Sequence, residues 1–112
     1  MTVKVSSSPF GSQARTRVLL GLQLLVESYS RELARVFEMN LSGVQKALRS
    51  LERDGLVVAR AVGRTRVYRL NPRILGRREL ERYLDRLLES DTDLRRRAAT
   101  LRRRPRRSGK PL

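Results

Sequence analysis

Residues 41–55 read LSGVQKALRSLERDG and carry the start, period and stop signals of a single helix. Ser42 is a good N-cap, and Gln45 three positions later completes a capping box that satisfies two free amides at the helix start. Gly55 stands where a left-handed residue ends a helix. The sequence therefore predicts a helix over residues 42–54.

The two sides of this helix differ in chemistry. Apolar residues recur at spacings of three and four, which marks one side as core: Leu41, Val44, Ala47, Leu48 and Leu51. The remaining side is polar and basic: Gln45, Lys46, Arg49, Ser50 and Arg53. Gln and Arg make paired hydrogen bonds to base edges in the DNA major groove. A solvated surface shows the same pattern, so from this helix alone both interpretations stay open.

The segment before it, SRELARVFEM at residues 30–39, predicts a short helix with Ser30 as its N-cap. Only residues 39–41 separate this segment from the next helix. A connection this tight between two short helices is typical of a helix-turn-helix. An αα-hairpin without function is the alternative, and the basic side of the second helix argues against it.

Strand-forming residues follow Gly55. The runs LVVARAV at 56–62 and RVYRL at 66–70 predict a hairpin whose turn contains Gly63. Arginines recur along it: Arg60, Arg64, Arg66 and Arg69. Protection of an edge strand explains two or three of these charges. The pair Arg64 and Arg66 at the tip favours a contact with phosphate or the minor groove.

Two longer amphipathic segments flank this region. SQARTRVLLGLQLLVES at 12–28 predicts a helix, capped by Ser12, that is apolar on more than one side. It is either the central core helix or a helix that also packs on a second subunit, and both alternatives stay open. RRELERYLDRLLES at 77–90 predicts a helix with a leucine stripe that needs a partner surface. A capping box at 90–93 predicts a further, basic helix ending by Pro105.

Composition narrows the class of protein. The 112 residues fit one domain, and 39% hydrophobic residues support a modest core of mainly α structure with a small β-hairpin (α+β). The net charge of +15 predicts attraction to polyanions, and nine basic residues without an acidic one lie in residues 95–112. The chain has no Cys and no His, which excludes disulfides, zinc-finger sites and thiol or imidazole catalysis.

The order helix, helix, tight turn, helix, Arg-rich hairpin, helix resembles the winged helix-turn-helix regulators of bacteria and archaea, most closely the ArsR-like group. The residues that carry the resemblance, Tyr29 to Pro72, are YSRELARVFEMNLSGVQKALRSLERDGLVVARAVGRTRVYRLNP. The resemblance implies a flexible arm at 1–11, a winged DNA-binding domain at 12–76 and a dimerisation helix at 77–89. A basic extension at 90–112, disordered beyond about residue 105, completes the expected organisation.

The resemblance also implies site residues. The recognition helix, 42–54, would enter the major groove, and the wing, 57–70, would contact phosphate or the minor groove. The DNA-binding residues it implies are Ser30, Arg31, Ser42, Gly43, Gln45, Lys46, Arg49, Arg53, Arg60, Gly63, Arg64, Thr65 and Arg66. The homodimer interface it implies is Leu20, Leu24, Leu80, Tyr83, Leu84, Leu87 and Leu88. We expect such a dimer because leucines on the first helix and on 77–89 exceed what a winged core of this size buries.

No metal or other cofactor is expected. Metal-sensing members of the group use Cys and His, which this chain lacks. Glu89, Asp91 and Asp93 are hard-cation ligands by type, but helix capping and the helix dipole already explain acids at that point. Whether an effector exists stays open.

The leading hypothesis is a homodimeric, sequence-specific regulator that binds double-stranded DNA. The alternative is a nucleoid-type architectural or RNA-binding protein whose basic tail dominates with little sequence specificity; a winged domain used only for protein contacts is a third. An enzyme is not expected, because no nucleophile and base constellation is present. With no signal peptide and no apolar run near the ~20 residues that span a bilayer, we expect a cytoplasmic protein that does not enter membranes.

Overall fold

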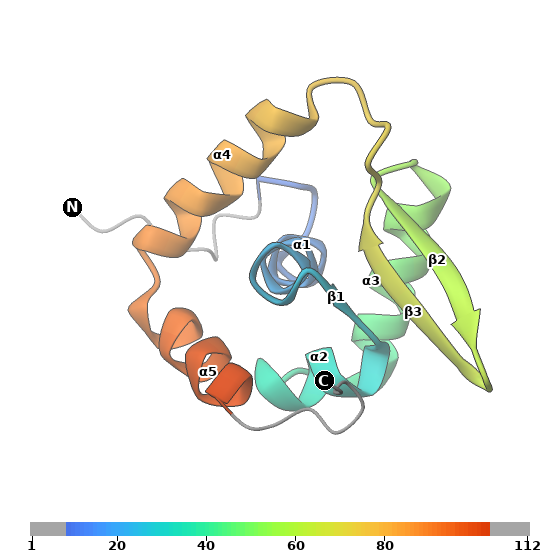
Figure 1. Ribbon diagram of the computed structural model, residues 1–112, viewed down its shortest axis with the longest axis horizontal. Helices are drawn as coiled ribbons and strands as arrows, with labels where there is room; N and C mark the ends of the chain where they lie inside the picture. The colour runs from blue at the N-terminus through green and yellow to red at the C-terminus, as the bar shows by residue number, and fades with distance from the viewer. Residues whose placement is uncertain (1–8, 104–112) are drawn as a thin grey trace.

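The computed structural model describes residues 9–103, without the side chains of Ala98 and of 101–103. Within this part the chain forms five helices and a three-stranded antiparallel sheet (Figure 1). The fold class is mixed α+β, as predicted, and is compatible with a winged helical fold. Predictions for residues 1–8 and beyond residue 103 lie outside the described residues. The elements in order are α1 (Gln13–Leu25), β1 (Glu27–Ser28), α2 (Ser30–Val36), α3 (Leu41–Arg53), β2 (Val57–Val62), β3 (Thr65–Leu70), α4 (Arg77–Glu89) and α5 (Thr92–Arg103).

Helix α1 lies at the centre of the molecule, with the other helices and the sheet arranged around it (Figure 1). Its side chains Val18, Leu19, Leu20 and Leu22 are at most 1% exposed. Ser12 caps the helix as predicted, by accepting a hydrogen bond from the backbone N–H of Arg15. Because its own chain covers α1 on several sides, α1 is the central core helix, one of the two alternatives that the sequence left open.

A glycine lets α1 and α2 approach closely. A Cβ atom at Gly21 would lie 2.7 Å from Cδ2 of Leu33 and would collide with the ring of Phe37. Any larger residue at this position therefore forces the side chains of Leu33 and Phe37 to shift in a close-packed core.

Helices α4 and α5 belong to the same core. Leu84, Leu87 and Leu88 of α4 are at most 5% exposed and cluster with Leu20 of α1 and Leu94 of α5. The expectation that leucines of the first and fourth helices are surplus to one chain is therefore wrong, because α1 is wide enough in apolar surface to cover them itself.

Three residues of the predicted dimer surface remain partly accessible. Tyr83 is 45% exposed and lies beside the ring of Phe10, with ring centroids 5.7 Å apart. Leu24 and Leu80 are half-buried against the core. Of the predicted interface, these three side chains are what the fold leaves at the surface.

The sheet has the strand order β1-β3-β2. Strands β2 and β3 form the predicted hairpin, paired from Val57 with Leu70 to Val62 with Thr65. Gly63 takes a φ of +62° in the two-residue turn, which is the glycine position of a type II′ turn. Strand β1 pairs with β3 on its other edge, Ser28 opposite Tyr68. The sequence did not predict β1, because a two-residue strand is too short to show a period.

The predicted capping box of α3 is wrong. Asn40, and not Ser42, is the N-cap: its Oδ1 accepts hydrogen bonds from the backbone N–H of Ser42 at 2.9 Å and of Gly43 at 3.3 Å. Helix α3 therefore begins at Leu41, one residue earlier than predicted. The predicted end is confirmed, since Gly55 follows with a φ of +82°.

Two further predicted caps are shifted. Helix α2 begins at Ser30 itself, after Tyr29, and has no side-chain cap. At the start of α5, Oδ1 of Asp91 accepts a hydrogen bond from the backbone N–H of Leu94 at 3.1 Å, while Ser90 instead bonds to a carbonyl at the end of α4. Asp is as good an N-cap as Ser, so the sequence pattern alone does not choose between adjacent positions.

Two arginines hold the turn that joins α2 to α3. Arg17 Nη2 donates a hydrogen bond to the carbonyl of Phe37 at 2.9 Å. Arg97 of α5 contacts Oε2 of Glu38 through Nη1 at 2.9 Å and Oδ2 of Asp93 through Nε at 3.0 Å. The hydrogen bond to Glu38 raises the pKa of the Arg97 guanidinium. The relative position of α2 and α3 is thus fixed from both α1 and α5.

Candidate nucleic-acid interface

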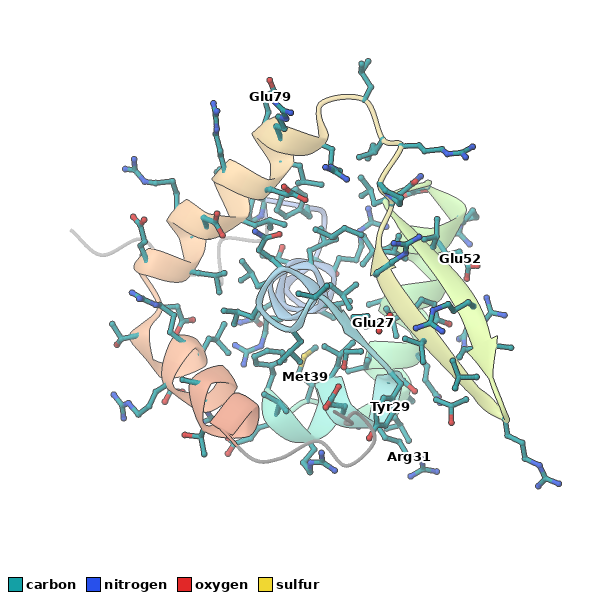
Figure 2. All side chains as sticks on the ribbon, in the orientation of Figure 1. Glu27, Tyr29, Arg31, Met39, Glu52 and Glu79 are labelled. Carbon is teal, nitrogen blue, oxygen red and sulfur yellow. The ribbon has the colours of Figure 1, made fainter. Side chains whose placement is uncertain are left out.

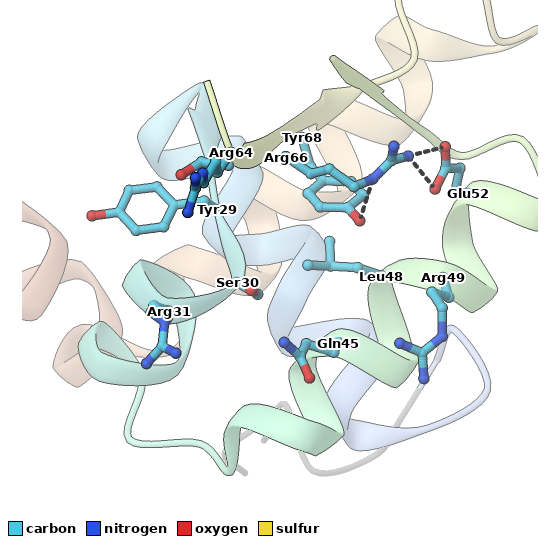
Figure 3. A pocket seen from close by; sticks show the side chains of 11 residues that line it. Tyr29, Ser30, Arg31, Gln45, Leu48, Arg49, Glu52, Arg64, Arg66 and Tyr68 are labelled. Atoms are coloured by element: carbon cyan, nitrogen blue, oxygen red, sulfur yellow. Dashed lines mark hydrogen bonds and ion pairs between the residues drawn. The ribbon is translucent and has the colours of Figure 1, made fainter. Parts of the chain in front are cut away.

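A groove of about 680 Å³ lies between the start of α2, the polar side of α3 and the β2–β3 hairpin (Figure 3). We call it the helix–hairpin groove. Three separate elements contribute to it, and each brings at least one arginine. Its lining residues are Tyr29, Ser30, Arg31, Gln45, Leu48, Arg49, Glu52, Arg64, Thr65, Arg66 and Tyr68.

Helix α3 presents its predicted polar side here. Val44, Leu48 and Leu51 are buried in the core, which turns the opposite side of the helix outward. Gln45 and Arg49 line the groove and point into it (Figure 3). Neither side chain has a hydrogen bond or ion pair with any described residue, so both are available to a ligand.

Four other predicted α3 residues lie outside the groove lining. Ser42, Lys46 and Arg53 are exposed, and Gly43 is half-buried at the helix start. At a helical repeat of 3.6 residues, Ser42, Lys46, Arg49 and Arg53 follow one another along the same side of the helix. They therefore extend the polar side of Gln45 and Arg49 beyond the rim of the groove.

The start of α2 supplies the second wall. Ser30 and Arg31 line the groove as predicted, together with Tyr29 directly before them. Figure 2 and Figure 3 show Tyr29 and Arg31 at this end of the helix. The side chain of Arg31 is exposed and has no ion pair with a described residue. This wall therefore adds one unpaired cation to the groove.

The hairpin supplies the third wall. Arg64 occupies the second position of the turn, after Gly63, and is exposed without an ion pair in the described part of the chain. Thr65 begins β3 beside it. The turn therefore holds one cation at the point of the hairpin farthest from the core.

Arg66 differs from Arg64 because it already has partners. Its Nη2 contacts both carboxylate oxygens of Glu52, at 2.9 and 3.2 Å, and its Nε donates to the hydroxyl of Tyr68 at 3.3 Å. The guanidinium also lies over the Tyr68 ring, 5.7 Å from its centroid. The Tyr68 hydrogen bond and then Glu52 raise the pKa of Arg66, so the residue stays charged and paired.

Arg60 lies on the other side of the hairpin. Side chains alternate between the two faces of a strand, and Arg60 stands opposite Val67 while Arg66 stands opposite Ala61. Arg60 Nη2 contacts Oε1 of Glu27 at 2.8 Å. The expectation that Arg60 shares a site with Arg64 and Arg66 is therefore wrong: strand alternation turns it away from the groove.

Sequence reasoning missed four lining residues of the groove: Tyr29, Leu48, Glu52 and Tyr68, of which Leu48 was assigned to the core alone. Tyr68 was recognised only as a strand former, yet its spacing of two from Arg66 places both on one face. Glu52 directly precedes Arg53 on α3, and no acidic residue of this helix was predicted to belong to the site. Its carboxylate joins the groove only through a partner fourteen positions away on the hairpin, which no local pattern shows.

Other kinds of site find no support in the described residues. No three Asp or Glu side chains among residues 9–103 gather as metal ligands. No helix in the same part of the chain has the length and apolarity to cross a bilayer. Comparison with protein-family models, with curated proteins and with solved structures gives no match to this chain.

Proposed function

We propose that this chain is a transcriptional regulator that binds double-stranded DNA at specific sequences, as a winged helix-turn-helix protein similar to the ArsR-like group. The observation that carries the proposal is the helix–hairpin groove. There, Gln45 and Arg49 of α3 stand unpaired opposite two unpaired arginines of other elements, Arg31 and Arg64. A B-DNA major groove about 12 Å wide admits one helix, and Arg31 and Arg64 add cations for the phosphates beside it.

Each wall of the groove has its own task in this proposal. Gln45 and Arg49 are rigidly held by the buried side of α3 and contact base edges, the only contacts that carry sequence information directly. Arg31 and Arg64 contact phosphates and set the position of the helix. Helix α2, the turn 37–40 and α3 form the helix-turn-helix, and the β2–β3 hairpin is the wing.

A homodimer stays part of the proposal with a smaller surface than the sequence suggested. Regulators that bind as two-fold dimers recognise half-sites about one helical turn apart or a multiple of it. Of the residues expected in the interface, Tyr83 and the half-buried Leu24 and Leu80 are accessible for pairing. The leucines buried between α1 and α4 take no part in it.

Selecting binding sites from a random pool of duplex DNA tests the proposal. The affinity of the purified protein for the selected site is then compared with that for bulk DNA. We expect a ratio of about 10³ or more, as for specific regulators. A ratio near unity would instead favour the architectural alternative, to which exposed Arg95 and Arg96 on α5 contribute. Failure to bind any DNA at physiological salt would contradict both.

A further inference from the structure

Glu52 is the only acidic residue among the described residues that line the helix–hairpin groove. It lies on α3, one turn after Arg49 and two turns after Gln45, and its carboxylate faces the hairpin (Figure 3). Both Oε atoms contact Nη2 of Arg66. In a groove proposed to bind DNA, this carboxylate repels the phosphates and weakens binding, so its position there needs an explanation.

The guanidinium of Arg66 can bind a phosphate in place of the Glu52 carboxylate. The side chains of Arg66 and Glu52 are 55% and 37% exposed, so solvent and ligands reach both. A guanidinium binds a carboxylate and a phosphate with the same two-pronged geometry. While Glu52 occupies those donors, Arg66 is not free to bind a DNA phosphate without breaking the pair.

Tyr68 holds Arg66 in place while Glu52 and a DNA phosphate compete for its guanidinium. It is 7% exposed, anchored in the core, and it holds the Nε edge of Arg66 from below. The guanidinium therefore stays at the groove wall whether or not Glu52 holds its Nη2 edge. Loss of the carboxylate frees donors that remain aimed into the groove.

We propose that Glu52 is an affinity-limiting residue that withholds Arg66 from the DNA backbone. This inference rests on the proposed function. By occupying Arg66 and by placing a negative charge among the phosphate-binding cations, Glu52 lowers affinity for DNA of every sequence alike. The base contacts of Gln45 and Arg49 then make up a larger share of the binding free energy. Specific binding and non-specific binding, which is almost wholly electrostatic, are weakened by the same factor, so the choice of sequence stays with Gln45 and Arg49.

The variant Glu52→Gln tests this directly, because it keeps the shape of the side chain and removes the charge. With one more phosphate contact, the slope of log K against log [salt] steepens by about 0.9, which corresponds to about a fivefold gain in affinity near 0.15 M salt. Fluorescence anisotropy with two labelled duplexes, the selected site and a scrambled sequence, measures both quantities. We expect the gain on both duplexes, with base preferences unchanged.

The pair of Glu27 with Arg60 provides a matched control. It joins the same two residue types at 2.8 Å, with side chains 45% and 57% exposed, on the outer face of the same sheet. Glu27→Gln changes the net charge equally but frees an arginine outside the groove. We expect it to leave the salt slope at the wild-type value. The double variant Glu52→Gln/Arg66→Ala should also return to the wild-type slope, since the freed guanidinium is gone.

The outcomes separate this inference from the proposed function. If wild-type protein binds neither duplex, the proposed function fails, and with it the role of Glu52. If the wild type binds, an unchanged slope in Glu52→Gln overturns the inference alone, as does an equal gain in Glu27→Gln. A changed preference at one base position would make Glu52 a base-reading residue that accepts from cytosine. Circular dichroism melting confirms that each variant is folded.

Discussion

At the scale of single residues, this chain shows that arginines alike in sequence are unlike in chemistry. Arg60 and Arg66 are neutralised by Glu27 and Glu52, whereas Arg64 has no partner among the described residues. Residue type and spacing predicted a basic hairpin correctly. They did not predict which of its charges are free, because each partner lies far along the chain and meets its arginine only in the folded state.

Replacing the unpaired hairpin arginine should cost more DNA affinity than replacing the paired one. Arg64→Ala removes one phosphate contact and should flatten the salt slope by about 0.9 while leaving base preferences unchanged. Arg60→Ala, the control on the outer face, should leave the slope as it is. Titrations of one duplex at several salt concentrations measure both, and equal slopes in the two variants would contradict the assigned geometry.

At the scale of elements, periodicity predicted the helices and the hairpin well, and helix starts poorly. The buried side of α3 is Val44, Ala47, Leu48 and Leu51, as predicted, while Leu41, also predicted as core, is half-buried at the helix start. The N-cap of α3 differs from the prediction, because Asn40 and Ser42 are both good capping residues and lie two positions apart. The choice depends on the turn after α2, whose path is set by contacts from α1 and α5.

The N-cap of α3 can be distinguished by mutation. Asn40→Ala leaves the amides of Ser42 and Gly43 without their acceptor and should lower the free energy of unfolding by about 1 kcal/mol. Ser42→Ala removes no acceptor from the helix start and should cost much less. Urea unfolding of both variants provides the measurement; the reverse order would restore the cap first predicted from the sequence.

Packing of α1 on α2 gives a second prediction at this scale. Gly21→Ala places a methyl group against Leu33 and Phe37, so overpacking should lower the free energy of unfolding by about 1–3 kcal/mol. Gly43→Ala is a matched control, because its Cβ meets nothing nearer than 3.9 Å. There, the helix preference of Ala should add up to about 1 kcal/mol. Urea midpoints that shift equally would exclude close packing at Gly21.

At the scale of the whole molecule, α1 lies at the centre, with the other helices and the sheet around it (Figure 1). The apolar surplus of α1 was visible in the sequence, as was the stripe of α4. Pattern alone does not say whether two such surfaces meet within one chain or between two chains. Leu84, at 0% exposure, shows that they meet within one chain.

Charge placed on α4 should therefore act differently at two neighbouring positions. Leu84→Glu buries a carboxylate without a partner and should abolish cooperative folding. Tyr83→Glu changes an exposed side chain and should keep the fold while weakening association of two copies. Circular dichroism and sedimentation velocity measure folding and association separately. A folded, monomeric Leu84→Glu variant beside a dimeric wild type would show that the leucines form an intersubunit surface after all.

The central claim is that the groove-facing side of α3 reads DNA bases, and Arg49→Ala tests it most directly. The variant and the wild type are titrated against a panel of single-base changes in the selected site. Since a paired Arg contact to a base provides about 1–3 kcal/mol of discrimination, we predict that Arg49→Ala loses its preference at one or two base positions in each half-site and keeps the others. A variant that binds more weakly but retains every preference would contradict the account, because α3 would then carry charge to the DNA without reading it.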